Sequence, residues 1–230
     1  MKKYIPIFII FGISFVLILL YISVAVPSFS MWFYRWQFEA NSTYERVQMQ
    51  PDQLHLVTRH LIDYMRGSGV DRDYGLQIYA IVAGISRPFF SEIEIRHMLD
   101  VYDLFMYGRI IRNVSIVLFF VSFLILLVDR KFIWHLIKSL QIASAGVLSL
   151  LVALISLVAI NWHAAFVLFH EIFFDNDYWI LNPRYDLLLN IVPYDFFITI
   201  SVVIGAMFGF FLLATFVAST FYLRKKGLKS

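Results

Sequence analysis

The sequence predicts an all-α fold, a four-helix transmembrane bundle with a helical extracytoplasmic region built from the first and third loops. Hydrophobic residues make up 60% of the 230 residues and charged residues only 15%, against about 25% charged residues in a soluble domain. Four apolar runs also reach the roughly 20 residues that a helix needs to cross about 30 Å of hydrocarbon. The predicted spans of this single integral membrane domain are residues 5–26, 110–128, 140–160 and 196–222.

The first run is followed by Pro27, Ser28 and aromatic residues, not by the small-residue motif at which a signal peptide is cleaved. We therefore expect this run to be retained as a span, and a cleaved signal peptide is the weaker alternative. The second run contains Arg112 and Asn113 near its start, where a side chain can reach back to the lipid headgroups. The third and fourth runs stay apolar throughout.

Basic residues predict the orientation of the chain, because cytoplasmic segments retain Lys and Arg. The predicted inner segments contain Lys2, Lys3, Arg130, Lys131, Lys138, Arg224, Lys225, Lys226 and Lys229. Residues 161–195 instead carry acidic residues with a single arginine, namely Glu171, Asp175, Asp177, Arg184, Asp186 and Asp195. Both termini are therefore expected in the cytoplasm, with loops 27–109 and 161–195 outside. The sequence shows no basic stripe with stacking aromatics, so no nucleic acid is expected as a partner.

Two amphipathic helices are predicted in the long outer loop. Apolar residues recur at helical spacing over Pro51–Arg66, and Gly67 is expected to end this helix. A second helix is predicted over Ser91–Tyr107, beginning with a capping box of Ser91 and Glu94. Such helices can cover a hydrophobic groove or lie in the membrane interface.

Gly108 separates the second of these helices from the second predicted span. A straight helix through Gly108 would place His97 about 15 Å above the outer membrane boundary, at 1.5 Å per residue. A bend at Gly108 would instead place His97 near the lipid headgroups, and we expect this bend.

Familiar enzyme signatures are absent from the sequence. There is no Gly-x-Ser-x-Gly elbow, Ser-x-x-Lys pair, phosphate-binding loop or dinucleotide-binding motif. The chain also has no cysteine, which excludes disulfides, thiolate ligands and a cysteine nucleophile. The candidates that remain are histidines with carboxylates and aromatic residues nearby.

His97 and His170 are the strongest of the six histidines. Asp100 follows His97 by one helical turn and could orient its imidazole. His170 lies among aromatic residues at the outer end of the third span, where a polar ring needs a reason to be present. The alternatives are a surface histidine satisfied by its neighbour and an interfacial histidine. His163 is seven residues before His170 and thus on nearly the same helix face, so a metal pair is conceivable.

Of the other three histidines, His55 and His60 are expected to be exposed bystanders, and His135, in the inner loop, is expected to have a plain interfacial role.

Three segments carry a family resemblance. They are His97-Met98-Leu99-Asp100-Val101, then Phe169-His170-Glu171-Ile172-Phe173-Phe174 followed by Trp179, and Ile191-Val192-Pro193-Tyr194-Asp195-Phe196-Phe197. In these motifs, and in length and topology, the chain resembles the four-span bacterial lipoprotein intramolecular transacylase family. The resemblance implies a bacterial cell-membrane enzyme that moves an sn-2 acyl chain from the S-diacylglyceryl group of a lipoprotein's N-terminal Cys to the α-amine of that Cys. The product is a lyso-form lipoprotein.

The resemblance also implies roles for named residues and partners. By these motifs His97 and His170 are expected to be catalytic. Apart from the resemblance, we expect Asp100 to orient His97, and Trp179 or Arg184 to contact the oxyanion or the headgroup. The expected partners are a diacylated lipoprotein substrate and membrane lipids, with no cofactor and no metal.

Elementary chemistry agrees with these roles. Aminolysis of an ester needs a base, an acid for the leaving oxygen and donors for the tetrahedral oxyanion, and histidine can serve as base and acid near neutral pH. Nucleophile and ester belong to one substrate, so no enzyme nucleophile is required. Two alternatives stay open: a metal-dependent membrane hydrolase using His97, His163 and His170, and a non-enzymatic accessory membrane protein.

Overall fold

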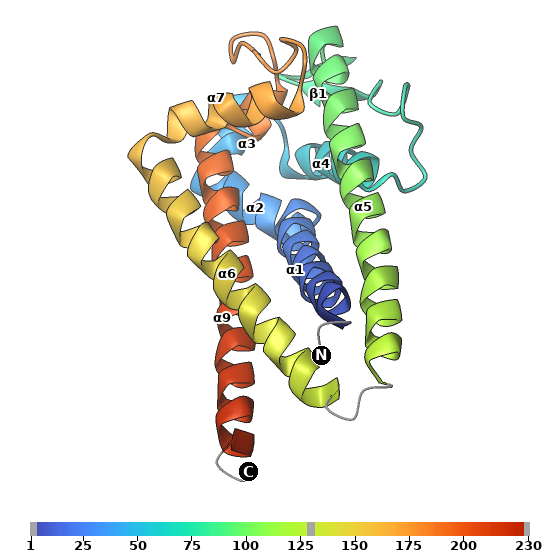
Figure 1. The fold of residues 1–230 in the computed structure, drawn as a ribbon. Coiled ribbons are helices and arrows are strands. Elements are labelled where there is room, and N and C mark those ends of the chain that lie inside the picture. The colour runs from blue at the N-terminus through green and yellow to red at the C-terminus, as the bar shows by residue number, and fades with distance from the viewer. Residues whose placement is uncertain (1–3, 128–131, 228–230) are drawn as a thin grey trace. The chain divides into compact units, whose positions relative to one another are not determined.

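The computed structural model describes residues 4–127 and 132–227 (Figure 1). Within these residues, nearly all regular structure is helical, which confirms the predicted fold class. The elements in chain order are α1 (Ile5–Ser28), α2 (Met31–Ala40), α3 (Thr43–Val47), α4 (Pro51–Arg66), β1 (Tyr79–Val82), β2 (Ile85–Pro88), α5 (Glu92–Leu126), α6 (Phe132–Ile160), α7 (Trp162–Phe173), α8 (Leu188–Ile191) and α9 (Tyr194–Gly227).

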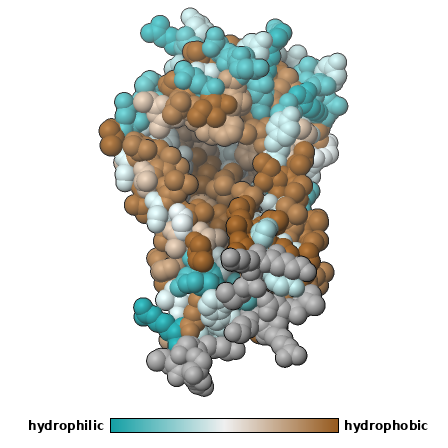
Figure 2. Space-filling model, in the orientation of Figure 1, coloured by the Kyte–Doolittle hydropathy of each residue, from teal (hydrophilic) through white to brown (hydrophobic). Residues whose placement is uncertain are grey.

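The chain divides into two compact units. The first, called here the membrane unit, comprises Met1–Val24, Gly108–Asn161 and Val203–Ser230. The second, called the loop unit, comprises Ala25–Tyr107 and Trp162–Val202. Hydrophobic side chains cover the long helices in Figure 2, whereas hydrophilic side chains gather over the loops and short elements.

Four helices of the described residues are long and apolar enough to cross a membrane. They are α1, α5, α6 and α9. Helix α6 begins at Phe132, eight residues before the predicted third span. The span was predicted from its apolar run alone, and the polar residues before that run are also helical. Some residues named in the predictions lie outside the described residues. They are the basic residues Lys2, Lys3, Arg130, Lys131 and Lys229, which support the predicted orientation, and Val128, the predicted end of the second span.

Small residues let helices of the membrane unit approach closely. A Cβ atom added to Gly12 on α1 would lie 2.9 Å from Ser139 Oγ and 3.0 Å from Ala143 Cβ on α6. The Ser139 hydroxyl donates a hydrogen bond to the Phe8 carbonyl on α1. Close backbone approach at small residues, with polar side chains bonding across, is how helices associate without a hydrophobic driving force.

The loop unit contains the predicted helix α4, whose bounds are those predicted. Gly67 ends it with φ +64°, a left-handed conformation that glycine adopts at little cost. The buried stripe of α4 includes Leu54, Val57 and Leu61 and packs in the aromatic core of this unit. Strands β1 and β2 pair in an antiparallel hairpin, which we did not predict, around a tight turn at Ala83 and Gly84.

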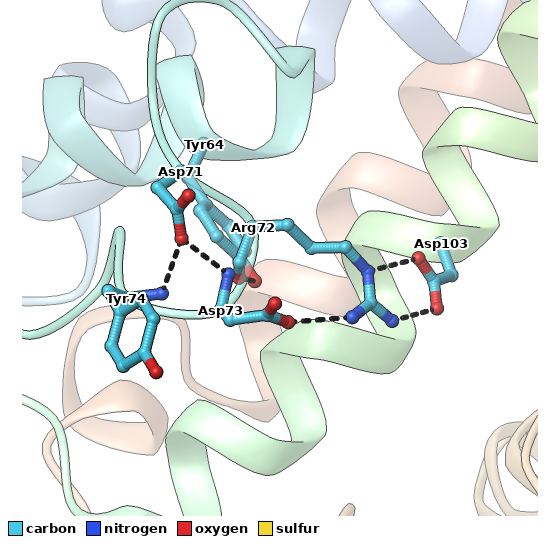
Figure 3. Close-up of polar contacts among 6 residues, drawn as sticks. All are labelled: Tyr64, Asp71, Arg72, Asp73, Tyr74 and Asp103. Carbon is cyan, nitrogen blue, oxygen red and sulfur yellow. Dashed lines mark hydrogen bonds and ion pairs between the residues drawn. The ribbon is translucent and has the colours of Figure 1, made fainter.

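Arg72 fixes the segment between α4 and β1 to α5. Its guanidinium donates two parallel hydrogen bonds to the Asp103 carboxylate, one of them from Nε to Oδ1 at 2.9 Å (Figure 3). Bidentate arginine–carboxylate pairs are geometrically specific. The Tyr64 hydroxyl on α4 also donates to the Arg72 carbonyl at 2.8 Å, so the segment is tied to two helices.

The predicted bend at Gly108 is wrong, because α5 is helical without a break from Glu92 to Leu126 (Figure 1). A single glycine inside a helix costs only about 1 kcal/mol relative to alanine, and helix-forming neighbours on both sides outweigh that cost. The chain does break between α6 and α7, where Asn161 is not helical. His163 and His170 therefore lie on a separate helix, α7, within residues 161–195, and His170 does not lie at the outer end of the third span as expected.

The contact at Gly12 predicts a difference between two glycine substitutions. Gly12→Val should lower the midpoint of thermal unfolding in detergent, because overpacking of a close helix contact costs about 1–3 kcal/mol. Gly146→Val on α6 is the matched control, since no atom lies within 4 Å of a Cβ added there. Equal midpoints for the two variants would refute the close contact of α1 with α6.

Candidate active site

The loop unit brings His97 and His170 together, although they are far apart along the chain. Their ring centroids lie 6.0 Å apart with an interplanar angle of 35°. His97 comes from α5 and His170 from α7, and the exposed fractions of the two residues are only 9% and 7%. Two neighbouring buried imidazoles form a site that could take up and return one proton.

Aromatic rings enclose the two histidines. The Trp179 ring stacks on His170 with centroids 4.7 Å apart and an interplanar angle of 29°. Phe174 contacts both imidazoles, at 5.4 Å from His97 and 5.6 Å from His170. Phe166 lies 4.3 Å from the His170 ring. Apolar surroundings of this kind limit hydration and disfavour a charged imidazole.

One nitrogen of His170 is already committed. Its Nδ1 lies 2.7 Å from the Phe166 carbonyl one turn earlier on α7, so Nδ1 carries a proton and donates it to that oxygen. In the neutral ring this leaves the lone pair on Nε2. The contact therefore selects the tautomer whose basic nitrogen is Nε2.

His97 has a buried polar atom without a partner. Its Nδ1 has no hydrogen-bond partner among residues 4–127 and 132–227. Asp100, expected to orient His97, instead accepts a hydrogen bond from Asn176 Nδ2 at 3.0 Å. A buried nitrogen left unpaired is costly, and such groups often have a functional role.

Both histidines are shifted toward the neutral form. Burial, with a smaller contribution from the proximity of His170, lowers the pKa of His97 to about 4. Burial also lowers the pKa of His170, opposed by its hydrogen bond to the Phe166 carbonyl. His97 precedes the membrane-crossing part of α5, because charged residues recur between Glu92 and Asp103. Both imidazoles are thus neutral, and able to accept a proton, at neutral pH.

A buried carboxylate holds the segment that carries Trp179 against α5. Ser91 and Glu94 form the predicted capping box, in which the Ser91 N–H donates to the Glu94 carboxylate. The other carboxylate oxygen of Glu94 accepts the N–H of Leu188 at the start of α8. The Ser91 hydroxyl donates to Asp186 at 2.9 Å, and Asp186 also accepts the Asn182 N–H at 2.7 Å. These bonds hold the segment before α8, which carries Trp179, against the start of α5, which carries His97.

Most of the chain matches one protein family. A family model described as lipoprotein intramolecular transacylase Lit matches residues 9–197. The chain belongs to the Lit family.

Solved Lit structures share the fold of this Lit-family chain. The structure of Lit from Bacillus cereus is 21% identical with a TM-score of 0.78, covering 100% of this chain and 99% of that one. A Bacillus cereus Lit variant with a histidine-to-arginine mutation is 19% identical with a TM-score of 0.75, covering 100% of this chain and 96% of that one. A variant with a histidine-to-alanine mutation is 20% identical with a TM-score of 0.75, covering 100% and 97%. No curated protein matches the chain.

Arg184 and His163, which the sequence also indicates as candidate site residues, do not join the pair of histidines in this Lit-family chain. Arg184 lines a separate hollow, and among the described residues no hydrogen bond or ion pair joins it to Asp186, His97 or His170. His163 is exposed and its ring lies 6.5 Å from that of Tyr194. The described residues contain no group of three His, Asp or Glu side chains that could hold a metal ion.

Two other histidines have structural partners in the loop unit. The His55 ring nitrogen lies 2.9 Å from the Tyr44 hydroxyl, and His60 bonds to the Gly75 carbonyl. His135 in the membrane unit packs against Phe8, with centroids 4.8 Å apart.

Sequence reasoning missed Asn176 and the long-range bonds of Glu94. Asn176 joins Asp100 to the backbone of Tyr178 through its side chain, which places the turn that precedes Trp179. The capping-box pattern identified Glu94, but its bond to Leu188 depends on residues 94 positions apart. An asparagine in a loop has no sequence signal that distinguishes it from a solvated one.

The buried position of Glu94 predicts a stability difference within one helical turn. Glu94→Gln should lower stability by about 1–3 kcal/mol, because one of two backbone donors loses its charged acceptor. Glu92→Gln is the control, since Glu92 is exposed and its pair with Arg96 is worth about 1 kcal/mol or less. Thermal unfolding in detergent compares them, and equal losses would contradict the proposed role of the Glu94 carboxylate.

The lowered pKa of His97 predicts acid sensitivity. The unfolded chain binds a proton at this residue from about pH 6.5 downward, whereas the folded chain does so only near pH 4. Stability from the neutral ring is therefore complete above pH 6.5 and is lost as the pH falls to about 4, by up to about 3 kcal/mol.

Thermal unfolding of the wild type and of His97→Gln between pH 8 and pH 4 measures this effect. The wild type should lose stability relative to the variant over that interval. A constant difference across the whole pH range would show that His97 is not buried in the neutral form.

Proposed function

We propose that this chain transfers the sn-2 acyl chain of a diacylated lipoprotein from the S-diacylglyceryl group to the α-amine of the N-terminal Cys, giving a lyso-form lipoprotein. Membership of the Lit family supports a transacylase acting on lipoproteins. The observation that carries the mechanism is the pair of buried imidazoles 6.0 Å apart, one with its tautomer fixed.

We propose further that the site faces the outer leaflet of the bacterial cell membrane and that both termini are cytoplasmic. The two units then act as one membrane domain, with residues 27–109 and 161–195 outside. The excess of Lys and Arg at the predicted inner segments supports this orientation. The acyl chains of the substrate remain in the lipid during the reaction.

His170 is the proposed base. Its Nε2 accepts a proton from the α-amine as the amine nitrogen attacks the ester carbonyl carbon, forming the new C–N bond and a tetrahedral oxyanion. The C–O bond to the glycerol then breaks, and the protonated imidazole returns the proton to the leaving sn-2 oxygen. One imidazole therefore serves as base and acid, and no proton is left over.

His97 is proposed to stabilise the oxyanion. Its unpaired buried nitrogen is available as a hydrogen-bond donor in the tautomer that carries a proton there, and a preorganised donor in apolar surroundings is effective because it needs no reorganisation. Trp179 stacks on His170 and is proposed to fix the plane of its ring. Asp100 acts indirectly, by holding Asn176 and the turn before Trp179.

Nucleophile and ester lie on one substrate, so the main task of the site is to fold that substrate. Holding two reacting groups in a near-attack geometry can contribute about 7–11 kcal/mol in favourable cases. A protein nucleophile would add a second acyl transfer without simplifying the first. The alternative metal-dependent hydrolase would need His163 beside the other two histidines, and His163 is exposed on α7.

Mass spectrometry of lipoprotein N-termini tests the proposal. Cells expressing the wild-type chain should contain lyso-form lipoprotein with an N-acyl group, whereas His97→Ala and His170→Ala should reduce this form at least about 100-fold, the lower end of what acid–base catalysis contributes. His163→Ala is the matched control on the same helix as His170 and should retain activity.

Chelation separates the two enzyme alternatives. The purified wild type should remain active after treatment with a metal chelator.

Acyl positions that are the same with and without the chain would refute the transacylase proposal. Loss of activity in His163→Ala together with loss on chelation would favour the hydrolase.

A further inference from the structure

A second polar site lies in the loop unit, at a hollow of about 350 Å³. Three arginines line it, Arg46 from α3, Arg87 from β2 and Arg184 from the segment before α8. No Asp or Glu is among the residues that line it. Three exposed arginines from distant parts of the chain therefore line one small volume, and none of its lining residues is a carboxylate.

Like Arg35, Arg59 and Arg66 of the same unit, these arginines form no ion pair within the described residues. Arg72 and Arg96 instead form ion pairs with neighbouring carboxylates. Arg46 donates one hydrogen bond to the Asn41 carbonyl, which anchors its guanidinium. An anion bound in the hollow would be attracted by all three guanidiniums.

The backbone around the hollow is fixed by specific contacts. Gln48 and Ala83 line it with φ of 50° and 51°, left-handed conformations that residues other than glycine rarely adopt, and the Ala83 N–H donates to the Gln48 carbonyl at 3.1 Å. The Asn190 side chain donates to the Pro183 carbonyl at 2.8 Å. The two left-handed conformations belong to the C-cap of α3 at Gln48 and to the hairpin turn at Ala83, and the hydrogen bond between the two residues joins these elements beside the hollow.

We propose that this three-arginine hollow binds a phosphate group, either free or carried on a lipid headgroup. A carboxylate offers two oxygens and satisfies one guanidinium in bidentate fashion, whereas a phosphate offers oxygens to several guanidiniums at once. The apolar walls formed by Val47, Val82 and Leu187 leave room for the carbon atoms attached to the phosphate. This inference does not depend on the transacylase proposal, and it gives Arg184 a role apart from the two histidines.

Binding of phosphate probes by the full-length chain in neutral detergent tests the proposal. Inorganic phosphate and sn-glycerol 3-phosphate are titrated calorimetrically at constant ionic strength against the wild type, Arg87→Gln and Arg184→Gln. In parallel, native mass spectrometry measures lipid retained by the chain after release from phosphatidylglycerol or phosphatidylcholine nanodiscs. Arg59→Gln is the matched control, since Arg59 is exposed in the loop unit and does not line the hollow.

The expected result is saturable binding by the wild type, weakened at least about tenfold by either hollow variant and unchanged in Arg59→Gln, because each arginine supplies charge-assisted hydrogen bonds. Binding of the soluble probes assigns a free phosphate. Retention of phospholipid without binding of the soluble probes, with the same pattern among variants, assigns a headgroup. Absence of binding by every probe, equal binding by all variants, or tighter binding of a glutamate-rich peptide than of any phosphate overturns the proposal.

Discussion

The site depends on one buried carboxylate, that of Glu94. It accepts N–H groups from two places that are far apart in sequence, Ser91 at the start of α5 and Leu188 at the start of α8. Burial raises the pKa of Glu94, and the hydrogen bonds from the Ser91 and Leu188 N–H groups oppose that shift. A buried acceptor that loses its donors bears the cost of desolvation. Because His97 follows Glu94 by one turn and Trp179 belongs to the segment that ends at Leu188, this contact determines which groups meet the two imidazoles.

The chemistry of the site follows from that enclosure. Apolar rings around His97 and His170 keep both imidazoles neutral, as their lowered pKa values indicate. Lowering the pKa of an imidazole weakens it as a base, but it keeps the ring in the neutral form, which is the form that can accept a proton at neutral pH. The Phe166 carbonyl then selects which nitrogen of His170 is basic. Burial and one backbone hydrogen bond thus favour the neutral state of the His170 ring and fix its tautomer.

The sequence predicts those features that depend on local patterns. Apolar runs predict the four long helices, and Gly67 predicts the end of α4. The motifs around His97 and His170 indicate the family. Their ring centroids lie 6.0 Å apart because the part of α5 up to Tyr107 and helix α7 belong to the loop unit, which no local pattern predicts. The predicted third span ends at residue 160, where α6 ends, but the helix α7 that follows was not predicted. The straight path of α5 through Gly108 reflects neighbours that outweigh one glycine.

The unbroken course of α5 constrains the spacing of the chain. Each residue of a helix advances the axis by 1.5 Å and turns it by about 100°. Inserting or deleting one residue between His97 and Ile110 would therefore rotate the imidazole by more than a quarter turn relative to the apolar stretch that follows, whereas the same change in a surface loop would be absorbed locally. The number of residues between His97 and Ile110, and not only their identity, therefore determines the direction in which the imidazole points.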